Sequence, residues 1–167
     1  MNRMFYQNNQ FRGDISNWDT SRVTNMEQMF GSATLFGGSS YPSGTGSGTL
    51  ANWDVSSVTN MNQMFDGAEI FNQNIGGWDV SKVTDMQEMF DSAKTFNQNI
   101  GQWNTTNVVN MSYMFRNAKQ FDQDINAWNT SAVIDMRSMF QNGENFNQSL
   151  NNWDVSSVTN MEGMFGS

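Results

Sequence analysis

Residues 71–96 read FNQNIGGWDVSKVTDMQEMFDSAKTF, and this frame recurs along the chain. The tryptophans that mark the recurrence are Trp18, Trp53, Trp78, Trp103, Trp128 and Trp153. The last four intervals between them are 25 residues long, and the first is 35. A unit this short cannot bury its own apolar face, whereas stacked units bury a continuous core between neighbours. We therefore expect a single stacked domain over residues 1–167, a fragment of a longer repeat array.

The longest interval contains a tract of different composition. Residues 37–49 read GGSSYPSGTGSGT and hold the only proline of the chain, Pro42. Glycine, serine and proline are typical of turns and loops. We expect a Gly/Ser-rich surface loop over residues 37–49, inserted in one coil.

The second half of each unit has the apolar spacing of a helix. In the quoted unit the apolar or small residues are Met86, Met89, Phe90, Ala93 and Phe96. Their offsets of 0, 3, 4, 7 and 10 place them on one face of a helix. Asp85 precedes this segment, and an acid follows three residues later at position 88, which resembles an N-cap with a capping box. We predict one short helix here in every coil.

The first half of each unit is short and polar, with a turn after the tryptophan. In residues 79–81 the Asp side chain can accept the backbone N–H two residues later, forming an Asx-turn. A strand over residues 72–78 would pair with its counterpart in the next coil about 4.8 Å away. The predicted fold class is α/β: a leucine-rich-repeat-like, right-handed solenoid with one short parallel strand and one short helix per 25-residue coil. A pure β-solenoid is the alternative.

Composition excludes several classes of function. The chain has 8 basic and 16 acidic residues, a net charge of −8, so nucleic acid and anionic membranes would be repelled. No apolar run reaches the roughly 18 residues of a membrane helix, and we expect no membrane insertion within this segment. The chain has neither Cys nor His, which removes thiolate or imidazole zinc sites and histidine bases. We predict that it is not an enzyme and holds no metal or cofactor.

The repeat frame resembles that of a known family. The pattern FNQ-x-[IL]-x-x-W-[DN]-[VT]-[ST]-x-V-T-[ND]-M-x-x-M-F resembles the bacterial surface-protein repeat, about 26 residues long, of mycoplasma and Listeria-type surface lipoproteins. It is also similar to the leucine-rich repeats of BspA-like surface proteins. The resemblance implies an extracellular location, attached to the cell surface through the parent protein, and a role in adhesion.

The tryptophan row offers a candidate binding site, with an alternative. If Ile75 points inward, Trp78, three residues on, could face outward on a straight strand. An exposed aromatic stripe would stack on sugar rings or other aromatics. In the alternative, the chain bends and the indoles fill the core. The candidate ligand-binding residues are Trp53, Trp78, Trp103 and Trp128, together with Asn74, Asn99 and Asp124 beside them.

Other rows favour structural roles. The Asp/Asn row could hold calcium, but turn and cap hydrogen bonds explain the same residues. The Met and Phe rows that include Met86, Met89 and Phe90 have core spacing rather than that of a soft-metal or cofactor site. The row of hydroxyls that includes Ser81 has no adjacent base, and Lys82 occurs in one unit only. These rows predict no catalytic residues and no metal ligands.

The predicted function is a non-catalytic extracellular module that binds a host or environmental protein or glycan. Weak contacts on adjacent coils would act together through effective concentration. One alternative is a structural spacer or stalk that associates end to end through apolar edges at Met1 and Met161. Another is an ice-binding solenoid, because the row Thr24, Thr59, Thr84, Val109, Ile134 and Thr159 is rich in threonine.

Overall fold

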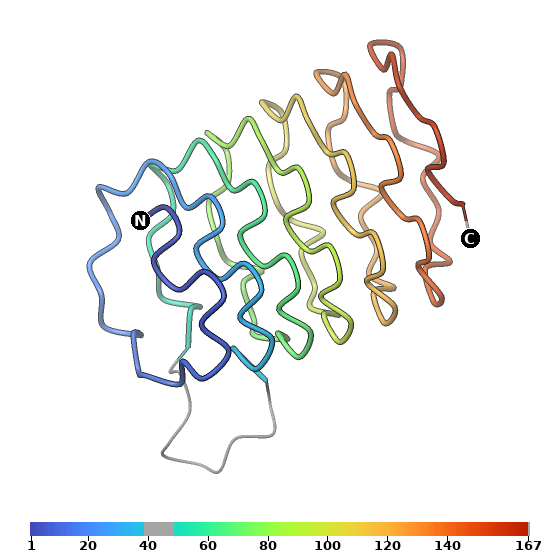
Figure 1. The fold of residues 1–167 in the computed structure, drawn as a ribbon. Helices are drawn as coiled ribbons and strands as arrows, with labels where there is room; N and C mark the ends of the chain where they lie inside the picture. The colour runs from blue at the N-terminus through green and yellow to red at the C-terminus, as the bar shows by residue number, and fades with distance from the viewer. Residues whose placement is uncertain (39–48, 167) are drawn as a thin grey trace.

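The computed structural model describes residues 1–38 and 49–166. In that part of the chain the backbone runs as a series of irregular coils, which lie side by side in chain order from the N-terminus to the C-terminus (Figure 1). Most of the loop predicted over residues 37–49 lies outside the described residues.

The described residues contain no helix and no strand longer than a single bridged residue. The isolated parallel bridges are Asn25–Asn60, Asn60–Asp85, Asp85–Asn110, Asn110–Asp135 and Asp135–Asn160. The predicted α/β leucine-rich-repeat-like solenoid, with a strand and a helix in each coil, is therefore wrong. The pure β alternative fails for the same reason.

Alternating hydrogen bonds replace the predicted helix. The N–H groups of Met89, Asp91 and Ala93 each bond to the carbonyl three residues back, at 3.1–3.2 Å. The N–H groups between them bond instead to the next coil: Phe90 N donates to Met114 O at 2.9 Å and Ser92 N donates to Arg116 O at 2.8 Å. A helix would need every N–H for its own i−4 carbonyl. Here half of these donors join one coil to the next.

Left-handed residues interrupt the same segment. Glu88 and Ser92 have φ values of 54° and 56°. The same two positions of other coils are left-handed at Gln28, Ser32, Gln63, Gly67, Tyr113, Asn117, Ser138 and Asn142. A non-glycine residue in this region costs about 1–2 kcal/mol, and a right-handed helix cannot pass through it. The inter-coil hydrogen bonds on either side offset this cost.

Turns also replace the predicted strand. Trp78 N donates to Ile75 O at 3.1 Å and Val83 N donates to Val80 O at 2.9 Å. The chain therefore bends between Ile75 and Trp78, and both side chains point into the core with 0% and 4% exposure. Thr84 N then donates to Thr59 O at 2.9 Å, next to the bridged residue Asp85.

The core is a set of rows in which like residues stack on like. Successive rings of the Phe row that contains Phe90 lie 5.4–5.7 Å apart. In the Trp row, Trp18 and Trp53 lie 6.5 Å apart, and successive rings from Trp78 to Trp153 lie 6.3–6.5 Å apart. The Met rows that include Met86 and Met89 are fully buried in the middle coils. The prediction that the Met and Phe rows form the core is confirmed.

Candidate binding surface

The four candidate tryptophans lie in the core. Trp53, Trp78, Trp103 and Trp128 are 2–4% exposed. Each indole Nε1 donates to a backbone carbonyl of the preceding coil at 2.9–3.2 Å, as in Trp103 to Ile75. Their ring faces stack on neighbouring aromatics and are not open to a ligand. The alternative that the indoles fill the core accounts for their placement, and the exposed stripe is absent.

The other three candidate residues, Asn74, Asn99 and Asp124, are exposed and lie in one row. Each Oδ1 accepts the backbone N–H two residues later, at 3.0, 3.0 and 2.9 Å. Asp14, Thr49 and Ser149 make the same contact in their own coils. We call these six residues the first turn row. Their side chains are held by the turn, so few rotamers remain to be fixed when a ligand arrives.

A second turn row follows five residues later and consists of Asp19, Asp54, Asp79, Asn104, Asn129 and Asp154, all exposed. Each Oδ1 accepts the N–H of a Ser or Thr two residues on, at 2.9–3.2 Å. The Asx-turns predicted here are confirmed. Hydrogen bonding from the Ser side chain, and then from its backbone N–H, lowers the pKa of the four aspartates. The row therefore remains anionic at neutral pH.

The recurring FNQ triplet builds a ladder that sequence reasoning missed. Asn72 Oδ1 accepts the backbone N–H of Asn97 at 3.0 Å and the Gln98 amide at 2.9 Å. Asn97 Oδ1 does the same for Asp122 and Gln123, at 3.0 and 2.8 Å. The regular recurrence of Asn-Gln after Phe was the available signal. Side chains of these triplets therefore join successive coils from Asn72 to Gln148.

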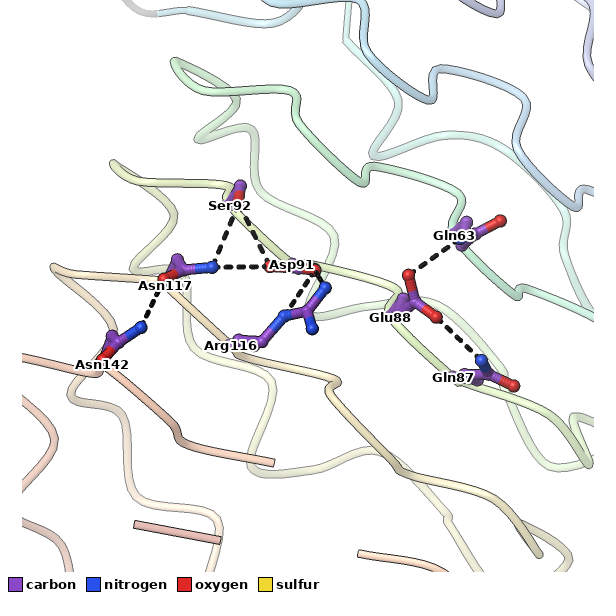
Figure 2. A network of polar contacts seen from close by, with 8 residues as sticks. All are labelled: Gln63, Gln87, Glu88, Asp91, Ser92, Arg116, Asn117 and Asn142. Atoms are coloured by element: carbon purple, nitrogen blue, oxygen red, sulfur yellow. Dashed lines mark hydrogen bonds and ion pairs between the residues drawn. The ribbon is translucent and has the colours of Figure 1, made fainter. Parts of the chain in front are cut away.

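A polar network crosses three coils around Asp91, whose side chain is buried (Figure 2). Arg116 Nε donates to Asp91 Oδ2 at 2.9 Å, and Nη2 contacts the same oxygen. Asn117 Nδ2 donates to Asp91 Oδ1 at 3.1 Å, and Asn142 Nδ2 donates to Asn117 Oδ1 at 2.9 Å. The charge of this aspartate is matched by one guanidinium and supported by neutral donors.

Beside this network, Glu88 is held by amides. Gln63 Nε2 and Gln87 Nε2 each donate to one of its oxygens at 2.8 Å (Figure 2).

In residues 1–38 and 49–166 no three acidic side chains gather in a way that could hold a metal ion. The same residues include no helix able to span a membrane.

A hollow of about 260 Å³ lies at the last coil. Its walls include the rings of Phe140, Phe146 and Phe165 and the polar residues Asn142 and Glu144. One of these wall residues, Phe165, is 63% exposed to solvent. None of the predicted ligand-binding residues lines it.

Comparison with known proteins places the chain in a family. Three matches to the family described as "Mycoplasma protein of unknown function, DUF285" cover residues 1–41, 41–142 and 99–167. The chain belongs to this family. The resemblance to a mycoplasma-type repeat is confirmed at this level, and the family carries no assigned function. No curated protein and no solved structure is significantly similar to the chain.

Proposed function

We propose that this DUF285 chain is a non-catalytic extracellular module that binds a protein or glycan through its two turn rows. The observation that supports the proposal is the repetition of exposed, turn-held polar side chains in every coil described. Asn74, Asn99 and Asp124 belong to the first turn row, and Asp79 and Asn104 to the second. Attachment to the cell surface through the parent protein, as in lipoproteins and BspA-like surface proteins, is part of the proposal.

The mechanism is multivalent hydrogen bonding. In Asn74 and Asn99 the turn occupies Oδ1, and the side-chain nitrogen makes no hydrogen bond within the part of the chain that the structure describes. A ligand with a repeating pattern of acceptors could engage several coils at once. Each contact is weak, but linked contacts raise the effective concentration for the next. Because the second turn row is anionic, the ligand is expected to be neutral or cationic along that edge.

The first turn row contains natural substitutions that show how to test the proposal without unfolding the turns. Thr49 and Ser149 keep the turn with a hydroxyl in place of an amide. The variants Asn74→Ser, Asn99→Ser and Asp124→Ser should therefore preserve each turn and remove the amide or carboxylate. Asn145→Ser changes an exposed amide outside both rows and serves as the control.

Glycan and protein arrays probed with the chain give the first readout, and titration of a hit by the variants gives the second. We expect the triple variant to lose roughly a hundredfold or more in affinity, more than any single variant, and the Asn145 variant to bind normally. An array without hits, or a triple variant that binds like the parent, contradicts the proposal. Concentration-dependent oligomers without ligand would favour the spacer or stalk, and thermal hysteresis would favour ice binding.

A further inference from the structure

One row of the stack brings two carboxyl groups together. The same position of successive coils is occupied by Gly31, Asp66, Asp91, Arg116 and Gln141. Backbone hydrogen bonds fix the register on both sides of Asp66. Phe65 N donates to Met89 O at 2.9 Å, and Gly67 N donates to Asp91 O at 2.8 Å. Asp66 therefore lies against Asp91 of the next coil.

The two aspartates have different surroundings. Asp91 is bonded by Arg116, Asn117 and its neighbour Ser92, whose Oγ donates to Oδ1 at 3.1 Å (Figure 2). After Asp66 the equivalent of Ser92 is Gly67, which has no hydroxyl to donate. The Asp66 side chain makes no hydrogen bond within the part of the chain that the structure describes. The guanidinium that serves this row is already engaged by Asp91.

Most of the charged groups near Asp66 are negative. Asp91 and Glu88 belong to the next coil, and Arg116 lies one coil further. The preceding coil contributes Gly31 and Ser32, which carry no charge. Burial, and then Asp91 and Glu88, raise the pKa of Asp66 from 3.8 to about 7, while Arg116 opposes the rise.

We propose that Asp66, packed against Asp91 and Glu88, makes the contact between these two coils a proton-dependent joint. The joint is tight while Asp66 is neutral. Loss of its proton places a third negative charge beside two others with a single guanidinium to balance them. The two coils then separate more readily, and the amides of Phe65 and Gly67 open more often. This inference does not depend on the proposed binding function.

The sign of the effect follows from linkage. The pKa of Asp66 is higher in the folded chain than its ordinary value of 3.8, so the folded state holds the extra proton between about pH 4 and pH 7. The contribution of this group to stability is complete below pH 4. It declines as the pH rises through the folded pKa and is absent above it. The folding constant loses up to about tenfold per pH unit from this group inside that window.

The test compares the full chain with Asp66→Asn, which is isosteric and cannot titrate. Denaturant unfolding between pH 5 and pH 8.5 gives the ratio of the folding constants of D66N and the parent. We expect the ratio to rise by roughly a hundredfold between pH 5 and pH 8, most of it below pH 7, and to level off above that. Any stability change that the amide causes independently of pH shifts the ratio equally at every pH and does not alter its rise. A ratio independent of pH overturns the proposal.

Two further variants locate the effect. Asp79→Asn changes an exposed aspartate of the second turn row and should leave the parent's profile between pH 5 and pH 8.5 unchanged. Gly67→Ser supplies Asp66 with the hydroxyl that Asp91 receives from Ser92, at a position where Ser32 and Ser92 accept the same left-handed backbone. An added Cβ there would lie 3.3 Å from the Ser32 Cα, a tight contact. We expect G67S to shift the parent's decline toward lower pH, and no shift would count against the joint.

Hydrogen exchange supplies a local readout. After correction for intrinsic exchange, the amides of Phe65 and Gly67 should lose protection between pH 5.5 and pH 7.5 in the parent and not in D66N. Equal loss of protection in both proteins contradicts the joint. Carbon-13 titration of the Asp66 carboxyl provides the direct check, and a midpoint near 4 would overturn the inference.

Discussion

Phe90 and Phe165 occupy the same position of two coils, yet Phe90 is completely buried and Phe165 is 63% exposed. Phe90 lies between Phe65 and Phe115, with ring centroids 5.7 and 5.6 Å away, whereas among the described residues Phe165 stacks only on Phe140 at 5.6 Å. Phe90 has a coil on both sides and also stacks on Phe96 of its own unit at 4.0 Å, whereas Phe165 is covered by one neighbouring coil. Burial of this ring therefore depends strongly on contacts with neighbouring coils.

The largest expected effect comes from removing the ring in each place. Phe90→Ala leaves a cavity between two coils and should cost about 3–5 kcal/mol of unfolding free energy. Phe165→Ala removes a ring that water already reaches, and should cost less than about 1 kcal/mol. Guanidinium unfolding of both variants measures the difference. Similar costs for the two would show that neighbouring coils do not determine burial.

Close approach between coils gives the second comparison. An added Cβ on Gly101 would lie 2.4 Å from the Asp124 carbonyl oxygen of the next coil, while one on Gly77 would meet nothing within 4 Å. Gly101→Ala should cost about 1–3 kcal/mol because a backbone must move. Gly77→Ala should be neutral or stabilising by up to about 1 kcal/mol, since alanine reduces the freedom of the unfolded chain. Thermal or denaturant unfolding of the pair is the check, and equal effects would contradict the stacking register.

Much of the core could be predicted from the sequence, and the backbone could not. Met86, Met89 and Phe90 are buried as expected, because the repeat places each beside its counterpart in the next coil. The same spacing also predicted a helix, and it failed because Glu88 and Ser92 adopt left-handed φ values. Neither is glycine, and glycine stands at these positions in few of the coils, as at Gly67 and Gly163, so the composition of this unit did not indicate the break.

The predicted caps show the same limit. Asp85 Oδ1 accepts the Gln87 N–H at 2.9 Å, which is the contact expected of an N-cap. A turn held by the next coil follows in place of a helix. For the candidate site, the turn-forming Asn74 and Asn99 are exposed, but the tryptophans are not. The bend between Ile75 and Trp78 that buries both depends on coil packing, which alternation along a strand cannot reveal.

Replacing a tryptophan whose indole bonds to a neighbouring coil should cost less unfolding free energy than removing a buried ring, and should again depend on the neighbouring coil. Trp103 Nε1 donates to Ile75 O of the preceding coil at 3.2 Å, and the ring is 3% exposed. Trp103→Phe keeps a stacked ring but leaves that carbonyl without its indole donor, so it should cost about 1 kcal/mol. Trp18 is 37% exposed, and its indole makes no hydrogen bond within the described residues. Trp18→Phe should cost clearly less in the same unfolding assay, and the reverse order would contradict the neighbour-supplied bond.

The smallest expected effect is the change in acid sensitivity when a turn aspartate of the second turn row is replaced. This change should be the same in a middle coil and in the last one, because the Asx-turn is closed inside a single coil. Asp79 and Asp154 each accept the N–H of the Ser two residues on, at 3.0 and 2.9 Å, and hydrogen bonding by that Ser lowers both pKa values. A lowered folded pKa contributes stability above the unfolded value of 3.8, and that contribution disappears as the pH falls through the folded pKa.

Asp79→Asn and Asp154→Asn should therefore both reduce the loss of stability between pH 4 and pH 2, and by similar amounts. The amide keeps the turn, as Asn104 shows, but does not titrate in this range. Asn104→Asp is the converse variant and should make the chain more sensitive to acid. Unfolding midpoints across this pH range provide the measurement. A clear effect at Asp79 with none at Asp154 would mean that these turns also depend on neighbouring coils, and the distinction between local turns and shared burial would fail.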